Sequence, residues 1–143
     1  MARIFVAAAA AAGLALLGAA PATAAEAPAP QVFCGASGLQ AGLLTRLCAE
    51  VDGDQVQLVG RISLAGPPSP GSPGPRPQDL QTVLTGENPA GTAYRDVRFT
   101  GATVEVRGVG GPVPCAVAVH GSFAVASYPW APRPVTVDLP ASC

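Results

Sequence analysis

The 143-residue chain has no lysine, so its eight basic side chains are all arginine. Charged residues make up only 12% of the sequence, and the formal net charge is −1 at pH 7. The arginines are scattered singly, so no basic patch marks a site for nucleic acid or for an anionic membrane. We therefore expect no nucleic-acid partner.

Residue types that carry catalysis are equally scarce. His120 is the only histidine, and the alternation around it predicts that it lies on the polar face of a strand. A catalytic triad needs a histidine beside a nucleophile, and a zinc site needs several histidine or thiolate ligands. We predict that the chain is not an enzyme and that it binds no metal or other cofactor. No spacing selects an acid pair for sugar hydrolysis among the carboxylates Glu50, Asp52, Asp54, Glu87 and Glu105.

A long apolar run occurs only near the start of the sequence. It extends from Ile4 to Leu17, follows Arg3, and is succeeded by the small-x-small pattern Ala22-Thr23-Ala24. These features predict a cleavable signal peptide over residues 1–25. No later segment is long and apolar enough to anchor the chain in a membrane. We therefore expect a secreted, extracellular protein, and the Ala-, Gly- and Pro-rich composition is typical of a GC-rich bacterial genome.

Residues 26–31 form a proline- and alanine-rich arm that we expect to be flexible, and residues 32–143 predict a single secreted domain. Its four cysteines are Cys34, Cys48, Cys115 and Cys143. In an exported chain they predict two disulfides, with Cys34–Cys48 and Cys115–Cys143 as the preferred pairs. The alternative joins Cys48 to Cys115 or Cys143 across two sheets. In neither arrangement do we expect the thiols to act as ligands or nucleophiles.

Apolar and polar residues alternate with a period of two along most of the domain, which is typical of half-buried strands. About seven such segments, rich in proline and glycine at their ends, predict a small antiparallel β-sandwich, Ig-like in general architecture. A small β-barrel is the rival. A short helical turn is the only helix we expect, between residues 37 and 44. The predicted strands cover residues 46–51, 55–64, 80–85, 93–100, 103–109, 115–127 and 135–139.

Two segments are too rich in proline to be strands. Residues 66–77 contain six prolines and predict an extended loop, because proline cannot donate to a ladder. Residues 128–134 hold the binding residues we predict, Tyr128, Trp130 and Arg133, in a proline-constrained turn. The alternative for this turn is a hydrophobic plug at one end of the sandwich. If it binds, replacing Trp130 with alanine should abolish binding without unfolding the domain.

These observations predict an exported, non-catalytic extracellular β-domain that acts as a binding or cell-surface-associated module. We expect a monomer whose partner is an extracellular protein or a glycan. A secreted protease inhibitor is the alternative, with Arg95, Arg133 or an apolar residue at the scissile bond, because Arg76 precedes a proline. An unrecognised hydrolase is the third possibility.

Overall fold

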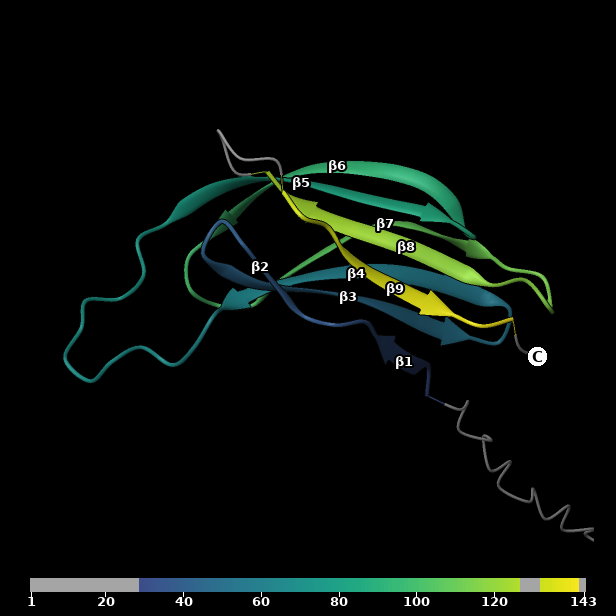
Figure 1. Ribbon diagram of the computed structural model, residues 1–143, viewed down its shortest axis with the longest axis horizontal. Coiled ribbons are helices and arrows are strands. Elements are labelled where there is room, and N and C mark those ends of the chain that lie inside the picture. Colours follow the sequence, from purple (N-terminus) through teal and green to yellow (C-terminus); the bar gives the residue numbers. More distant parts are fainter. Residues whose placement is uncertain (1–28, 127–131, 142–143) are drawn as a thin grey trace, which may run out of the picture.

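The computed structural model describes residues 29–126 and 132–141 (Figure 1). These residues form nine β-strands and no helix, so the predicted all-β class is confirmed. No helix in the described ranges is therefore long and apolar enough to span a membrane. The strands are β1 (Gln31–Cys34), β2 (Gly38–Gln40), β3 (Leu43–Asp52), β4 (Gln55–Leu64), β5 (Gln78–Glu87), β6 (Ala90–Phe99), β7 (Val104–Pro112), β8 (Val119–Val125) and β9 (Val135–Leu139).

The strands form two antiparallel sheets. The five-stranded sheet has the order β1-β3-β4-β7, with β2 also pairing with β3, and the four-stranded sheet has the order β6-β5-β8-β9. Side chains of both sheets contribute to one hydrophobic core, so the two sheets face each other. No ladder joins one sheet to the other within the part of the chain that the structure describes. Each sheet therefore has one face turned to the other sheet and one outer face.

All seven predicted strands are present, although several differ in length. The predicted strand at 115–127 is wrong at its start, because β8 begins only at Val119 and Ala116 has a positive φ of 65°. The helical turn predicted between residues 37 and 44 is also wrong. A hairpin connects β2 to β3 there, and Ala41 and Gly42 both have positive φ in its turn. The short strands β1 and β2 were not predicted.

A tight hairpin turn joins β3 to β4. Asp52 pairs with Gln55, and Gly53 has a φ of 61°, which suits the first central position of a tight hairpin turn. The predicted proline-rich loop over residues 66–77 contains no strand, and all of its residues are exposed. Figure 1 shows this loop extending away from both sheets between β4 and β5.

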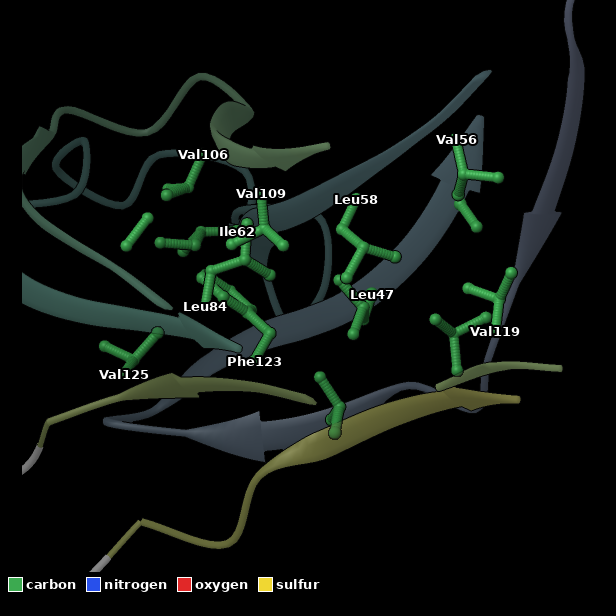
Figure 2. Packing of buried hydrophobic residues seen from close by; sticks show 14 of the residues in the cluster. Leu47, Val56, Leu58, Ile62, Leu84, Val106, Val109, Val119, Phe123 and Val125 are labelled. Carbon is green, nitrogen blue, oxygen red and sulfur yellow. The ribbon is translucent and has the colours of Figure 1, made fainter. Parts of the chain in front are cut away.

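Inward-facing side chains of both sheets form one hydrophobic core. Burial of such apolar surface is the main source of stability in a domain of this size. Figure 2 shows this core, to which the five-stranded sheet contributes Leu47, Leu58 and Ile62 and the four-stranded sheet contributes Leu84, Phe123 and Val125.

Strand β4 is irregular near Gly60 in two respects. The register between β4 and β7 shifts between Leu58 and Val59, where β7 carries Gly108 as an extra residue. Gly60 itself faces the core, and a Cβ atom there would lie 2.5 Å from ring carbons of Phe123. The absence of a side chain at Gly60 therefore makes room for the Phe123 ring from the opposite sheet.

One buried amide joins the two sheets. Gln40 on β2 accepts a hydrogen bond from the Val125 N–H (2.7 Å) and donates to the Phe123 carbonyl oxygen (3.2 Å), both on β8. It also donates to Thr45 Oγ1 (2.9 Å). The β8–β9 ladder reaches only as far as the Phe123–Val135 pair. The Gln40 side chain therefore provides hydrogen-bond partners for backbone groups of β8 that lie beyond the end of the β8–β9 ladder.

The predicted disulfide between Cys34 and Cys48 is confirmed. The two residues are direct partners in the β1–β3 ladder, so the bond ties the edge strand β1 to β3. The alternative in which Cys48 bonds to Cys115 or Cys143 is therefore wrong. Cys115 is not free, but Cys143 lies outside the described residues, so the Cys115–Cys143 pair remains a prediction.

Candidate binding surface

The predicted binding residues divide between described and undescribed parts of the chain. Arg133 is exposed just before β9. Tyr128 and Trp130 lie outside the described residues, so the predicted aromatic pair remains a prediction. The last described residue before them is Ala126, whose N–H donates to the Gln81 carbonyl oxygen of β5 (2.8 Å). The chain therefore enters the predicted binding segment from the four-stranded sheet.

His120 lies on the outer face of β8, as predicted. Its Nδ1 is hydrogen-bonded to the carboxylate of Asp138 on β9. That bond, with smaller contributions from the charges of Asp138 and Glu87, raises the pKa of His120 above its ordinary value. The nearby Ser122 hydroxyl is bonded to Thr85 Oγ1 (2.5 Å). Among the described residues, His120 is thus the partner of a carboxylate, and no hydroxyl nucleophile is hydrogen-bonded to it.

Four charged side chains form a network on the outer face of the five-stranded sheet. Arg107 donates to Glu50 (2.6 Å) and to Glu105 (2.9 Å), and Arg61 donates to Glu105 (3.1 Å). The hydrogen bond from Arg107 lowers the pKa of Glu50 below its ordinary value. A general acid near neutral pH requires a carboxyl group with a raised pKa. Glu50 is therefore poorly suited to act as a general acid.

Apolar side chains on the same face are covered. Val59 and Cys48 point outward from β4 and β3, yet both are fully buried. Arg107 is the ladder partner of Val59, and long arginine side chains cover apolar surface with their methylene groups. Each charge of the network is already paired. The outer face of the five-stranded sheet therefore presents few free groups to a ligand.

Within residues 29–126 and 132–141, no three His, Cys, Asp or Glu side chains gather closely enough to hold a metal ion. The carboxylates Asp52 and Asp54, considered as acids from the sequence, flank the turn between β3 and β4 and are exposed.

The outer face of the four-stranded sheet is different, because an aromatic side chain stands free on it. Tyr94 in the middle of β6 is 73% exposed. Its ladder partner is Val83 on β5, and Val83 in turn pairs with Ala124 on β8. The regular ladder on this strand fixes the position of the Tyr94 ring relative to the sheet.

A shallow depression of about 380 Å³ lies beside this ring. Gln81 and Asp96 are direct ladder partners next to Tyr94, and neither side chain makes a hydrogen bond or ion pair with another described residue. The depression thus combines an exposed ring, an amide and a carboxylate. We call its outward-facing lining, Gln81, Val83, Tyr94, Asp96 and Ala126, the Tyr94 surface.

A row of hydroxyl groups borders the Tyr94 surface. The pairs Thr92–Thr85, Thr85–Ser122 and Ser122–Thr136 place one hydroxyl residue on each of the four strands. This row runs across the sheet, parallel to the row formed by Tyr94, Val83 and Ala124. The outer face therefore presents alternating rows of apolar and hydrogen-bonding groups.

Tyr94 was not among the binding residues predicted from the sequence, although its place in the alternating pattern indicates exposure. The predicted strand at 93–100 places Val97 and Phe99 on the core face, so the same alternation places Tyr94 with Asp96 on the polar face. This step of alternation predicts that the Tyr94 ring lies on the outer face of the sheet.

Comparison of the chain with protein-family models, curated proteins and solved structures finds no match.

Proposed function

We propose that this protein is a secreted, non-catalytic binding domain with an Ig-like β-sandwich, and that it binds glycans through the Tyr94 surface. The exposed ring of Tyr94 is the observation that carries this proposal. The Cys34–Cys48 disulfide supports the extracellular part, since disulfides persist in oxidising compartments. The signal peptide predicted over residues 1–25 supplies the route of export.

The chemistry of the Tyr94 surface suits a sugar. A sugar ring has an apolar face that stacks on an aromatic side chain and hydroxyl groups that need hydrogen-bond partners. Tyrosine provides rigid, amphipathic contact area at low cost in conformational entropy. The free amide of Gln81 and carboxylate of Asp96 lie beside the ring and can pair with those hydroxyls.

The rigidity of the sheet supports the same proposal. Tyr94 lies in a ladder of ten consecutive residue pairs between β5 and β6. Ligand binding to such a surface orders few backbone torsions, so less of the interaction energy is lost to entropy.

The test is a binding assay against soluble and insoluble glycans, including bacterial cell-wall polysaccharide. Tyr94→Ala should weaken binding about tenfold or more, because truncating an aromatic anchor typically costs about 2 kcal/mol. Tyr94→Phe keeps the ring and should bind nearly as well as the wild type. Leu39→Ala is the matched control, since Leu39 is also highly exposed but lies on β2.

Binding that is unchanged in Tyr94→Ala, or equally weakened in Leu39→Ala, would refute the assignment of this surface. A protein that binds no glycan in either form would refute the ligand class. The Trp130→Ala variant tests the predicted segment at 128–134 in the same assay.

A secreted protease inhibitor is the second candidate, supported by the exposed proline-rich loop. The loop has internal order, because Ser72 donates to the Ser69 carbonyl oxygen through both its N–H (3.0 Å) and its hydroxyl (2.7 Å). A preorganised loop loses little entropy on docking into a protease. Arg95 fits this role poorly, since it lies inside β6 and pairs with Thr82. A panel of serine and metalloproteases at micromolar protein would exclude this function if none is inhibited.

A further inference from the structure

A separate pocket lies at one end of the two sheets, between β1, the β3–β4 turn, the β7–β8 connection and the end of β9. Its volume is about 230 Å³. Buried core residues, Val56, Val113 and Val119, line it from inside. Figure 2 shows Val56 and Val119 at one end of the core, away from most of the other labelled residues. The pocket therefore continues the core toward solvent.

The core is incomplete at this end. Phe33 on β1 pairs with the inward-facing Ala49, yet it remains 40% exposed. Val51, Val117 and Leu139 also line the pocket and are only partly buried. Covering exposed apolar surface is favourable by about 25 cal/mol per Å². A small apolar molecule seated here would complete the burial of these side chains.

The volume of the pocket limits the size of that molecule. An apolar cavity of about 150 Å³ is enough for benzene. Pockets for drug-sized ligands are usually larger than about 300 Å³. The 230 Å³ pocket therefore suits one ring with a short substituent, or a chain of about six carbon atoms.

The negative charge of Asp54, which lines the pocket, determines which charge the ligand can carry. Among the described residues that line the pocket, Asp54 carries the only ionisable side chain and none is an arginine. The Asp54 carbonyl oxygen accepts a hydrogen bond from the Val113 N–H (2.8 Å), which holds the turn against the β7–β8 connection. The Asp54 Oδ1 accepts one hydrogen bond, from Gln55 (3.2 Å), so Oδ2 is available to a ligand. A carboxylate in this position attracts a cation and repels an anion.

We propose that this pocket binds a small apolar molecule with a positively charged head group, such as an alkylammonium or an aromatic ammonium ion. The apolar part lies against Val119 and Leu139, and the head group lies beside Asp54. This site shares no residue with the Tyr94 surface, so it is independent of the proposed glycan binding.

The test compares hexylammonium, hexanol and hexanoate, which share one hydrocarbon chain and differ in charge. Each is titrated into the protein at low salt and followed by NMR. Hexylammonium should bind saturably and shift the methyl signals of Val119 and Leu139. Hexanoate should bind about threefold to tenfold more weakly, because an exposed charge pair contributes up to about 1 kcal/mol. Asp54→Asn should remove most of this difference, and so should high salt.

A second variant tests the pocket itself. Val117→Phe adds volume at the wall and should abolish binding of all three compounds. Val97→Phe is the matched control, since Val97 is also a partly buried valine packed on the core but does not line the pocket. The absence of saturable binding to the wild type, or binding that survives Val117→Phe, would overturn the site. Equal affinity for hexylammonium and hexanoate would overturn the head-group assignment.

Discussion

Replacing Gln40 with leucine should destabilise the domain strongly, although leucine is similar in size and more apolar. Gln40 is only 5% exposed, and its amide satisfies the Val125 N–H and the Phe123 carbonyl oxygen on β8. Each buried group left without a partner costs about 1–3 kcal/mol. The extra apolar burial of leucine offsets about 1–2 kcal/mol of that loss. We therefore expect the free energy of unfolding to fall by about 2–3 kcal/mol.

Urea unfolding followed by circular dichroism measures this change. The midpoint should fall while the slope against urea stays the same, which indicates a change in stability alone. Gln55→Leu is the matched control, because Gln55 is exposed and bonds only to the neighbouring Asp54. Its effect should remain within about 0.5 kcal/mol. A Gln40→Leu variant as stable as this control would show that the amide does not join the sheets.

The Gln40→Glu variant separates the donor from the acceptor. An ionised glutamate still accepts from the Val125 N–H but cannot donate to Phe123. Burial should raise the pKa of the new carboxyl group above its ordinary value of about 4.3. The folded variant then binds protons more tightly than the unfolded chain. Relative to the wild type it should be most stable below about pH 4 and should lose stability as the pH rises through the folded pKa. A loss that does not depend on pH would contradict this reasoning.

Two further predictions concern the packing between the sheets and the histidine. Gly60→Ala should lower the free energy of unfolding by about 1–3 kcal/mol, because its Cβ would overlap the Phe123 ring, whereas Gly66→Ala, in open space, should change it by less than about 0.5 kcal/mol. Asp138→Asn should lower the His120 pKa toward its ordinary value, measured by NMR titration of the imidazole, because it removes the hydrogen bond that stabilises the charged ring. In the wild type, the stabilisation from this pair is present below the unfolded pKa of about 6.5 and is lost as the pH rises through the folded value.

The strands were predictable because their outer faces are polar. In β7, Val104 and Val106 alternate with Glu105 and Arg107. This apolar–polar alternation indicates that one face of the strand is buried. The same rule placed His120 on the outer face of β8 correctly. It failed at β1, where every residue is exposed. A short edge strand held by a ladder and a disulfide has little burial pattern for alternation to detect.

The candidate sites were harder to predict because they depend on contacts between distant segments. Gln40 reads as a polar residue in a turn, and nothing near it in sequence reveals that β9 leaves the edge of β8 unpaired. The pocket beside Asp54 is lined by β1, the β3–β4 turn, the β7–β8 connection and the end of β9, which lie far apart in the sequence, so local pattern does not encode it. Tyr94 was accessible to sequence reasoning, since one step of alternation places it on the outer face. The binding residue predicted instead was Trp130, the single tryptophan of the sequence.

The two outer faces differ in how their polar groups are used, and this difference determines where a ligand can gain energy. On the five-stranded sheet, Arg107 already binds two carboxylates, so a ligand would have to break those pairs to make its own. Binding there would be weak, because each hydrogen bond to the ligand would replace an existing hydrogen bond within the protein. On the four-stranded sheet, the side chains of Gln81 and Asp96 make no hydrogen bond or ion pair with other described residues, and the Tyr94 ring faces solvent. A ligand there displaces only water. The Tyr94 surface, whose amide and carboxylate side chains are unpaired, is therefore the better binding surface.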